Sequence, residues 1–237
     1  MGESIEIRPS LESFGERFDL DSDQLDKLAR VISALARDEF APTAVSEPDR
    51  AIDIHLADSL VALELELVRG ASQIADMGAG AGFPGIPLAV ALPHSSVKLV
   101  ESQGRKCAFI ERVEAAAQIE NAETVCARVE EWPEGLGAHD VVLARALAAQ
   151  PVVLEYAAPL LRLGGALVDW RGRRDPHEER VAGRVAEILG LRLDSIRRVE
   201  PYEGVRDHHL HVYVKVTETP DRFPRRVGMA SKKPLAT

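Results

Sequence analysis

The stretch that decides the fold is Asp76-Met-Gly-Ala-Gly-Ala-Gly-Phe-Pro-Gly85. The apolar run 71–75 precedes it, and the apolar, helix-like segment 86–92 follows it. A strand, a glycine-rich turn and a helix in this order form the context in which a nucleotide-like cofactor lies against bare backbone. The alternating glycines, Gly78 and Gly80 among them, lack the Cβ atoms that would keep a ligand away, and they tolerate positive φ. We therefore expect a cofactor site here, with Asp76 as a hydrogen-bond acceptor at the end of the strand.

Downstream of residue 71, short apolar strands alternate with helical segments. The expected strands cover 72–77, 97–102, 123–127, 140–144 and 166–170, and the expected helices cover 84–92, 105–118, 151–162 and 175–189. Crossovers of this length predict a mostly parallel sheet that helices cover on both faces. Two strand-like runs, 193–199 and 209–216, have no helix between them and predict an antiparallel hairpin at the sheet edge. The sequence thus predicts an α/β, Rossmann-like fold with a mostly parallel seven-stranded sheet, the usual architecture of S-adenosylmethionine-dependent methyltransferases.

The segment before the glycine turn predicts a helical cap. Asp21 or Ser22 can cap a first helix, whose apolar face comprises Leu25, Leu28, Ile32 and Leu35. After a break at 41–49 a second helix follows, with an apolar face of Leu56, Leu60, Leu63 and Leu67. Residues 1–20 are expected to be poorly ordered, although Leu11, Phe14 and Phe18 offer apolar side chains for docking. The expected domains are a cap over 1–69, a Rossmann-like domain over 70–217 and a basic tail over 218–237.

Composition sets limits on the class of protein. Of the 237 residues, 46% are hydrophobic and 28% are charged, as in a soluble globular protein. The chain has no signal-peptide pattern and no run of about 18 apolar residues, so neither export nor a membrane span is expected. Cys107 and Cys126 are the only cysteines, which argues against a disulfide framework or a cysteine zinc site. We expect both cysteines to be packing residues in a reducing cytoplasm, and we expect no metal site.

The distribution of charge matters more than its sum. A net charge of −9 argues, by itself, against a nucleic-acid partner. Yet the last 16 residues contain no acidic residue and form a basic group of Arg222, Arg225, Arg226, Lys232 and Lys233. A second basic group near residue 172 comprises Arg171, Arg173 and Arg174. If these groups converge on one face they can hold a polyanion, whereas a merely solvated tail is the plainer interpretation.

The glycine stretch also satisfies the dinucleotide pattern G-x-G-x-x-G over 80–85, so an oxidoreductase has to be considered. A dinucleotide site needs free amides at the helix N-terminus for the pyrophosphate. Pro84 and Pro87 remove two of these donors, which favours S-adenosylmethionine, a cofactor without phosphate. Glu101, at the end of the second strand, can accept hydrogen bonds from the ribose hydroxyls of either cofactor, or it is merely a surface charge.

Further candidates lie at the ends of other strands. Val129 and Glu130 follow the third strand, where methyltransferases often hold the adenine. Arg145 ends the fourth strand and is a functional candidate, unless it only forms an ion pair with Glu101, Glu130 or Asp76. Trp170 is either a core residue or a surface on which a base stacks. His55 precedes Asp58 by one helical turn, which favours a structural His–Asp pair.

Several of these motifs together resemble one family. They are Asp76-Met-Gly-Ala-Gly-Ala-Gly-Phe-Pro-Gly-Ile-Pro-Leu-Ala89, Leu99-Val-Glu-Ser102, Arg105-Lys-Cys-Ala-Phe-Ile110, Arg128-Val-Glu-Glu131, Ala144-Arg-Ala146, His55-Leu-Ala-Asp-Ser-Leu60 and Phe223-Pro-Arg-Arg-Val-Gly-Met-Ala-Ser-Lys-Lys-Pro-Leu235. The chain is similar over residues 50–235 to the glucose-inhibited division protein B family. This resemblance implies methyl transfer from S-adenosylmethionine to N7 of a guanine in 16S ribosomal RNA. Two departures stand out: 41–46 lacks the family's Asn-Leu-Thr motif, and Arg171-Gly172 replaces its Lys-Gly.

The resemblance also implies roles for individual residues. Gly78 and Phe83 would line the methionine and adenosine sides of the donor, and Glu101 would take the ribose. Arg145 would lie where cofactor and guanine meet. The residues expected to contact RNA are Arg171, Arg225, Arg226, Lys232 and Lys233, while Val129 and Glu130 would flank the adenine. Small-subunit RNA or its precursor is the expected partner, with no membrane and no obligate protein partner.

Guanine N7 is an uncharged lone pair without a proton, so its methylation needs no general base. The enzyme mainly has to align N7, methyl and sulfur. Two alternatives remain at this point. A methyltransferase acting on a small molecule or a protein would not need the basic tail, and a nicotinamide-dependent oxidoreductase would bind NADH in place of S-adenosylmethionine.

Overall fold

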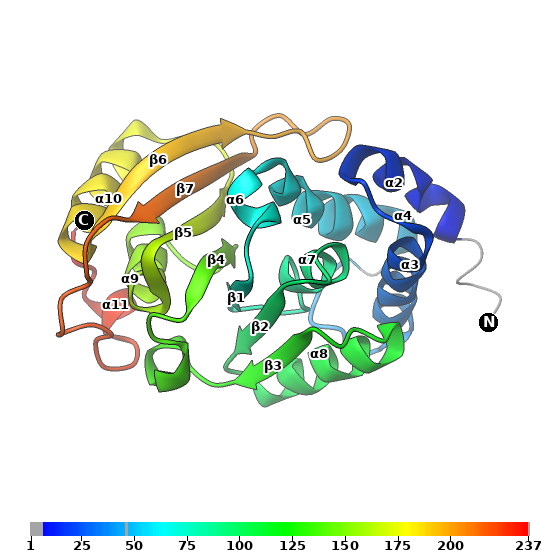
Figure 1. The fold of residues 1–237 in the computed structure, drawn as a ribbon, viewed down its shortest axis with the longest axis horizontal. Coiled ribbons are helices and arrows are strands. Elements are labelled where there is room, and N and C mark those ends of the chain that lie inside the picture. The colour runs from blue at the N-terminus through cyan, green and yellow to red at the C-terminus, as the bar shows by residue number, and fades with distance from the viewer. Residues whose placement is uncertain (1–6, 46, 237) are drawn as a thin grey trace.

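The computed structural model describes residues 7–45 and 47–236, and these contain one seven-stranded sheet (Figure 1). Its strand order is β3-β2-β1-β4-β5-β7-β6. The strands are β1 (Gln73–Met77), β2 (Ser96–Glu101), β3 (Ala122–Cys126), β4 (His139–Arg145), β5 (Leu161–Arg171), β6 (Leu191–Arg198) and β7 (His209–Lys215). The first five are parallel, while β7 is antiparallel to both β5 and β6. The predicted parallel sheet with an antiparallel edge hairpin is confirmed.

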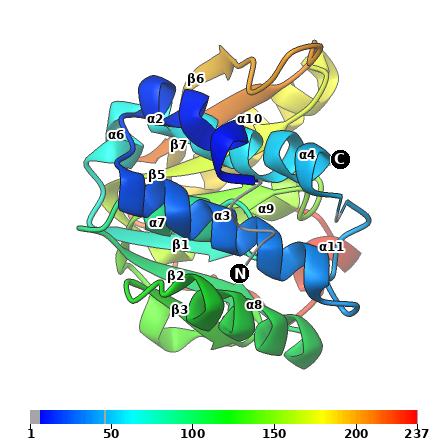
Figure 2. The ribbon, with the colours of Figure 1, turned by 90° about the vertical axis from the view of Figure 1, so that its right-hand side faces the viewer.

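Helices cover both faces of this sheet (Figure 2). Successive side chains of a strand point to opposite faces, so Ile74 joins one apolar cluster and Ala75 the other. The first face packs against the cap, α7 (Gly85–Ala91) and α8 (Gly104–Ala117). The second face packs against α9 (Gln150–Leu160), α10 (Pro176–Leu189) and the C-terminal segment. Because the strands are covered on both sides, their apolar runs are nearly continuous.

More of the cap is ordered than expected, and its helical segments are shorter and more numerous than expected. Its elements are η1 (Arg8–Leu11), α2 (Glu12–Phe18), α3 (Ser22–Arg37), α4 (Pro48–Ala51), a π-helical turn η2 (Ile52–Ala57), α5 (Asp58–Leu60), η3 (Val61–Glu64) and α6 (Glu66–Arg69). Asp21 caps α3 with a reciprocal bond to Gln24, as predicted. Poor order before residue 20 is wrong for residues 7–20, because Leu11, Phe14 and Phe18 dock into the core. The rest of that prediction falls on residues 1–6, which lie outside the described residues.

The second cap helix is not the single helix that its apolar spacing predicted. Ser59 Oγ donates to the carbonyl of His55, a contact that competes with the regular helical bond and bends helices. Leu65 then adopts extended backbone, with φ −97° and ψ 117°, and ends the run. The apolar spacing survives because 3₁₀ and α turns place similar faces toward the core. Cap and sheet share one apolar cluster, and the proposed boundaries at 69/70 and 217/218 stay a prediction.

The C-terminal segment folds back onto the second face of the sheet. Phe223 and Ala230 are buried, and α11 (Met229–Lys232) lies beside α9. Lys215, at the end of β7, donates to the carbonyls of Ala158 and Leu161 at 3.1 and 2.7 Å and so caps the end of α9. This segment is therefore part of the packed body over the residues described.

The expectation for the cysteines is wrong. Cys107 in α8 and Cys126 at the end of β3 form a disulfide, with Cα atoms 5.8 Å apart. Strand β3 pairs with β2 so that Cys126 lies opposite Glu101, and α8 begins directly after β2. Two cysteines 19 positions apart are thereby brought within the usual disulfide range by sheet pairing. Within residues 7–45 and 47–236, no helix is long and apolar enough to cross a membrane.

Candidate active site

The glycine turn after β1 has the backbone that its sequence requires. Gly78, Gly80 and Gly82 have φ of +69°, +62° and +90°. A Cβ on Gly78 would lie 2.5 Å from Cδ1 of Leu147, and one on Gly85 would lie 2.2 Å from Cδ2 of Leu99. Leu147 could shift its flexible end, so at Gly78 the positive φ is what requires glycine. A Cβ on Gly85 would also lie 2.8 Å from Asp76 Oδ2 and 3.0 Å from Asp76 Cβ, so glycine is needed there for the close approach of α7 to the sheet.

The first amides of α7 are all used inside the protein. Gly85 N–H donates to Asp76 Oδ2 at 2.8 Å, and Ile86 N–H donates to the carbonyl of Gly82 at 2.7 Å. Pro84 and Pro87 have no N–H to offer. A pyrophosphate at a dinucleotide-binding helix depends on such donors being free. The geometry therefore agrees with the argument from the prolines and disfavours a dinucleotide.

Asp76 has its carboxylate directed into the protein. Its side chain is 1% exposed, and it does not line either of the two cavities described below. Burial raises the pKa of Asp76 to about 7, against a lowering influence from the Gly85 hydrogen bond. The residue holds the glycine turn against the start of α7. We therefore assign it the role of positioning the turn, in place of the predicted contact with the cofactor.

A cavity of about 310 Å³ lies at the carboxyl ends of β1, β2 and β3. Four of the predicted cofactor residues line it: Gly78, Glu101, Val129 and Glu130. Glu101 is buried and accepts hydrogen bonds from Gly80 N–H at 3.2 Å and Gln103 N–H at 2.8 Å. These bonds fix the carboxylate at the cavity wall while leaving it lone pairs for a ligand. Gly80 and Phe83 are not among the lining residues.

A second cavity, of about 530 Å³, adjoins the first. Ala146 lines both cavities, and it has a positive φ of +52° although it caps no helix. Such backbone costs energy in a residue with a side chain and concentrates at functional sites. The larger cavity is lined by Arg145, Asp58, Trp170, Arg171 and His208, among others. Two cavities thus meet at the end of β4.

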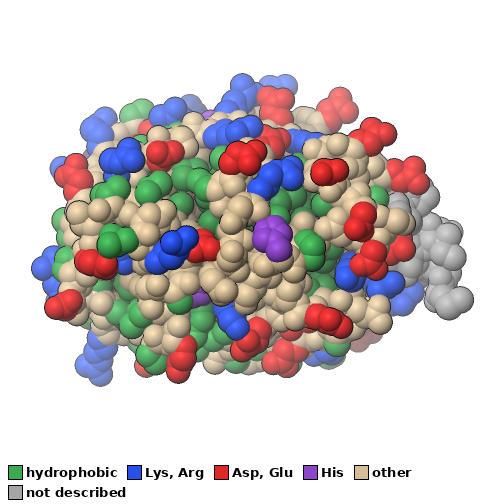
Figure 3. Space-filling model, in the orientation of Figure 1, with side chains coloured by type: hydrophobic (Ala, Val, Ile, Leu, Met, Phe, Trp, Pro, Cys, Tyr) green, Lys and Arg blue, Asp and Glu red, His purple; other side chains and the backbone are tan. Residues whose placement is uncertain are grey.

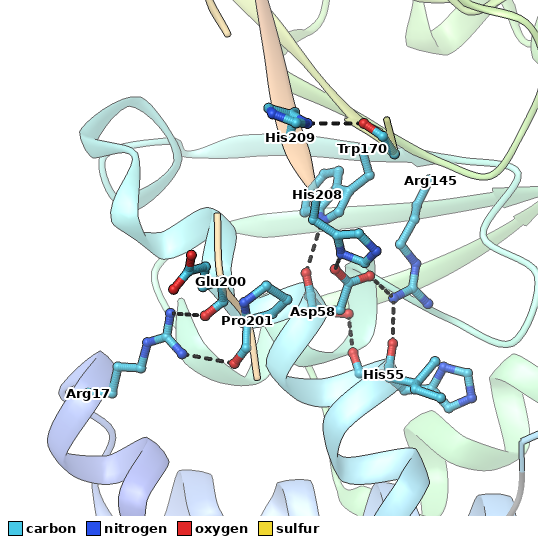
Figure 4. Close-up of polar contacts among 12 residues, drawn as sticks. Arg17, His55, Asp58, Arg145, Trp170, Glu200, Pro201, His208 and His209 are labelled. Atoms are coloured by element: carbon cyan, nitrogen blue, oxygen red, sulfur yellow. Dashed lines mark hydrogen bonds and ion pairs between the residues drawn. The ribbon is translucent and has the colours of Figure 1, made fainter. Parts of the chain in front are cut away.

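Asp58 joins three elements at the wall of the larger cavity (Figure 4). Its carboxylate accepts from Arg145 Nη1 at 2.8 Å and contacts His208 Nδ1 at 3.2 Å, while its carbonyl accepts from Trp170 Nε1 at 2.8 Å. The Asp58 hydrogen bond raises the pKa of His208. Arg145 is therefore in an ion pair, but with Asp58 and not with Glu101, Glu130 or Asp76. Trp170 is a buried core residue whose edge reaches the cavity.

The predicted His55–Asp58 pair is wrong. His55 Nε2 lies 3.1 Å from both Thr43 Oγ1 and the carbonyl of Val45, within the cap. Its ring stacks on Phe83, with centroids 4.6 Å apart and planes 9° apart. Burial lowers the pKa of His55, so the ring is neutral near pH 7. The π-helical turn sends the His55 side chain toward the glycine turn and Asp58 toward β4 (Figure 4).

The predicted RNA contacts fall into two groups. Arg171 lines the larger cavity, and Arg226, Lys232 and Lys233 are exposed. Arg225 differs, because its guanidinium forms two 2.6 Å bonds to the carboxylate of Glu155, a side chain only 3% exposed. Arg225 is thereby committed to anchoring the C-terminal segment. The face in Figure 3 shows basic and acidic side chains interspersed.

The C-terminal segment also reaches the smaller cavity. Gly228 N–H donates to Glu130 Oε1 at 3.0 Å. The side chain that was expected to flank the adenine is thus held by a residue nearly 100 positions away. This contact was missed, because nothing local in the sequence connects the two segments.

Sequence reasoning also missed a buried polar set at the back of the larger cavity: Gln150, Asp169 and His211. The signal was present, because Asp169 and His211 are polar positions inside apolar strands. The three histidines near the start of β7 have separate partners: Asp58 for His208, the carbonyl of Gly172 for His209, and Gln150 for His211. No group of three potential metal ligands occurs in the part of the chain that the structure describes.

Solved structures of similar shape include methyltransferases. One is an S-adenosylmethionine-dependent methyltransferase from Aquifex aeolicus, with a TM-score of 0.54, 17% identity, and coverage of 69% of this chain and 92% of that one. Another is Aeropyrum pernix fibrillarin with bound S-adenosylmethionine, with a TM-score of 0.53, 17% identity, and coverage of 67% and 73%. At this identity the likeness concerns the fold alone.

Sequence comparison is more specific. The family model for GidB, rRNA small subunit methyltransferase G, matches residues 22–206. A ribosomal RNA small subunit methyltransferase G from Rubrobacter xylanophilus is 38% identical over 195 residues, which is 80% of this chain and 75% of the relative. The Thermotoga neapolitana protein of the same name is 32% identical over 230 residues, covering 97% and 98%. With the glycine turn, the two adjoining cavities and these matches in place, the chain belongs to the GidB family of rRNA small subunit methyltransferase G proteins.

Proposed function

We propose that this protein transfers a methyl group from S-adenosylmethionine to N7 of a guanine in 16S ribosomal RNA. The observation that carries the proposal is the meeting of two cavities at Ala146, one beside the glycine turn and one beside Arg145. A group-transfer enzyme needs such an arrangement, because donor and acceptor must be held in contact. The family membership supports ribosomal RNA as the acceptor. The cytoplasm, where ribosomes assemble, is the corresponding location.

The smaller cavity suits S-adenosylmethionine. Its wall at Gly78 carries no side chain, and the carboxylate of Glu101 is fixed at the end of β2, where it can accept hydrogen bonds from ribose hydroxyls. Val129 and Glu130 would hold the adenine side. When bound, this cofactor supplies an electrophilic methyl group on a sulfonium, and no phosphate needs to be placed.

The larger cavity is proposed to take the guanine. Arg145 is neutralised by Asp58 at 2.8 Å, so its guanidinium opposes only weakly the positive charge that develops on a guanine methylated at N7. Because N7 carries no proton, no residue has to act as a general base. The protein's own contribution is to position the base and to exclude competing orientations.

Ribosomal RNA is large, and contacts outside the cavity are expected. Arg171 at the cavity, with Arg226, Lys232 and Lys233 in the C-terminal segment, offers charge for phosphates. Arg225 is left out of this set because Glu155 occupies its guanidinium. A methyltransferase acting on a small molecule is the competing function, and it would leave these exposed cations without a role.

Two measurements test the proposal. Calorimetric titration with S-adenosylmethionine and with NADH should give binding for the first only. Incubation with labelled S-adenosylmethionine and small ribosomal subunits or stripped 16S RNA, followed by mass spectrometry of nuclease fragments, should locate 7-methylguanine. Label on protein alone, or transfer only to small molecules, would refute the RNA assignment.

A variant at the glycine turn links activity to the cavity. Gly80→Val places a branched side chain at a φ of +62° beside Glu101, and we expect loss of S-adenosylmethionine binding by more than about tenfold. Gly164→Val is the matched control, because its φ is +79° and it lies in open space away from both cavities. If both variants bind the cofactor equally well, the cofactor does not lie against this turn.

A further inference from the structure

A buried polar set lies behind the larger cavity. Asp169 on β5 and His211 on β7 are cross-strand partners, and Gln150 is the first residue of α9. All three side chains are at most 3% exposed. The Gln150 amide nitrogen donates to Asp169 Oδ2 at 3.1 Å and lies 2.9 Å from His211 Nδ1. Buried polar groups on apolar strands are costly, so such a set invites a functional explanation.

The contacts of Gln150 determine which ring nitrogen of His211 carries the hydrogen. Burial raises the pKa of Asp169 to about 7. In the ionised form, which prevails above that pH, the carboxylate can only accept, so the end of the amide that faces Asp169 is then its NH₂ group. The same nitrogen faces His211 Nδ1, which must then accept. The hydrogen of the neutral ring is consequently on Nε2. Burial lowers the pKa of His211 to about 4, so the ring remains neutral at physiological pH.

The Nε2–H group of His211 has no acceptor. Among the residues that the structure describes, none is within hydrogen-bond distance of this buried atom. His211 is nevertheless one of the residues lining the larger cavity. An unmet buried donor is destabilising, and an acceptor that reached it from the cavity would remove this cost. An oxygen or an unprotonated nitrogen of a ligand in the cavity, or an ordered water, would satisfy this donor.

The surroundings indicate the kind of acceptor. Arg171 and Arg173 also line this cavity; Arg171 donates to the carbonyl of Ala148 at 3.0 Å and lies 3.8 and 4.0 Å from carboxylate oxygens of Asp169 and Glu178, and Arg173 is exposed. Arg174 is already paired with Glu179 in a two-bond contact at 2.7 and 2.8 Å. Asp175, Glu178 and Glu179 line the same cavity and balance much of its positive charge, so the exposed Arg173 is the cation offered to a ligand. A phosphate oxygen suits this arrangement because it accepts from charged and neutral donors alike.

We propose that His211, oriented by Gln150 and Asp169, donates a hydrogen bond through Nε2 to a backbone phosphate of the RNA nucleotide that enters the larger cavity. His211 is then a substrate-binding residue, and Gln150 is a positioning residue that fixes its tautomer. This assignment rests on the proposed function for the identity of the substrate. The site itself is testable with a mononucleotide and needs no methyl transfer.

The first test uses the wild-type protein with ¹⁵N-labelled histidine. Titration with guanosine 5′-monophosphate should shift the Nε2 resonance of His211, and guanosine alone should shift it several-fold less. Equal shifts with both probes would move the acceptor from the phosphate to the base and overturn the proposal. No shift with either probe would overturn it as well. Because the protein is unmodified, misfolding cannot obscure the result.

The second test removes the donor. His211→Phe keeps the ring volume, and we expect the KM for RNA to rise about ten- to a hundredfold, with kcat and S-adenosylmethionine affinity within about threefold of wild type. His139→Phe is the matched control, since His139 is equally buried but bonds only backbone carbonyls at the start of β4. An unchanged KM in His211→Phe would refute the assignment.

The third test addresses the positioning residue. Gln150→Leu should release the tautomer, so the ¹⁵N shifts of His211 should move toward a mixture of Nδ1–H and Nε2–H forms, together with part of the KM increase. Retention of a pure Nε2–H form would show that Gln150 does not orient the ring.

If the wild-type enzyme methylates no ribosomal RNA yet His211→Phe abolishes the preference for guanosine 5′-monophosphate, the proposed function fails and the phosphate site stands.

Discussion

At the scale of single residues, Asp58 holds together the wall of the larger cavity. One carboxylate and one carbonyl connect α5 to β4, β5 and the segment before β7. The side chain is mostly buried, so its charge depends on Arg145 and His208 for compensation. Removing one member of such a set leaves the others buried and unpaired, which costs more than the pair itself contributes.

Asp58→Ala is accordingly expected to lower the free energy of unfolding by about 3 kcal/mol. It should also reduce methylation of RNA strongly while changing S-adenosylmethionine affinity by less than about twofold, because Asp58 does not line the smaller cavity. Urea unfolding, activity assays and calorimetry measure the three quantities. Asp53→Ala, which removes an exposed carboxylate one turn earlier in η2, is the control. Equal unfolding midpoints for the two variants would contradict the role given to Asp58.

The raised pKa of Asp76 predicts that the stability of the protein depends on pH. Burial raises its folded-state pKa to about 7, well above the unfolded value of about 4. The folded state therefore binds this proton more tightly, and the associated stability is present below pH 4 and is lost as pH rises to about 7. Asp76→Asn keeps an acceptor for Gly85 N–H and has no charge to bury.

Relative to wild type, Asp76→Asn should gain about 2–4 kcal/mol of stability between pH 4.5 and pH 8. Urea unfolding at the two pH values gives this difference. Asp169, whose pKa burial also raises to about 7, is present in both proteins and cancels. A constant difference across this pH range would mean that Asp76 is not buried as an acid.

At the scale of elements, the end of β3 and the start of α8 form the outer wall of the smaller cavity, and a disulfide joins them. Cys126 ends β3, and Val129 and Glu130 follow it into the cavity. Cys107 lies next to Glu101, whose carbonyl its Sγ contacts at 3.3 Å. The bond closes a loop of 19 residues and restricts the unfolded chain.

Reduction of this disulfide should lower the free energy of unfolding by about 3 kcal/mol. Urea unfolding with and without a strong reductant measures the loss. The Cys126→Ser variant is the control: it should match the reduced wild type and should not respond to reductant. A wild-type midpoint that is insensitive to reductant would mean that the two thiols do not pair in solution.

For the whole molecule, distant segments brace the two cavities from outside. The cap is tied to the hairpin side through Arg17, which donates to the carbonyls of Glu200 and Pro201 (Figure 4). Arg17 also donates to the carboxylate of Glu64, and Arg197 donates to the same carboxylate. On the other side, the C-terminal segment is anchored by Arg225 on Glu155 and touches Glu130 through Gly228. The smaller cavity is lined by residues between Gly78 and Tyr156, and Gly228 holds one of them, Glu130, from the C-terminal segment.

Arg225→Ala should therefore act on stability first. It leaves the Glu155 carboxylate buried without its partner, and we expect a loss of about 3–5 kcal/mol, which Glu155→Gln in the same chain should partly restore. Replacing Arg226, Lys232 and Lys233 by alanine should leave the unfolding midpoint nearly unchanged. That triple variant should instead weaken RNA binding and flatten its dependence on salt. Unchanged RNA affinity at several salt concentrations would remove the segment from the RNA interface.

The sequence by itself determined the order and type of the main strands and helices, and the place of the glycine turn. Alternation with a period of two or 3.6 residues and the steric freedom of Gly78 and Gly80 are local properties, so they can be recognised without the fold. The crossover lengths then restricted the sheet to a mostly parallel one. The cap segment 52–65 was the exception, because a serine–carbonyl contact and an extended residue interrupt an otherwise regular spacing.

Only the tertiary structure decided which polar groups meet. Arg145 selects Asp58, 87 positions away, and Arg225 selects Glu155, 70 positions away, although several carboxylates lie nearer in sequence to each. These choices follow from strand register, from the helical turn on which a side chain lies and from how closely two layers pack. Cys107 and Cys126 pair for the same reason. A one-residue shift in any of these elements would change the partner, and no local pattern in the chain encodes that register.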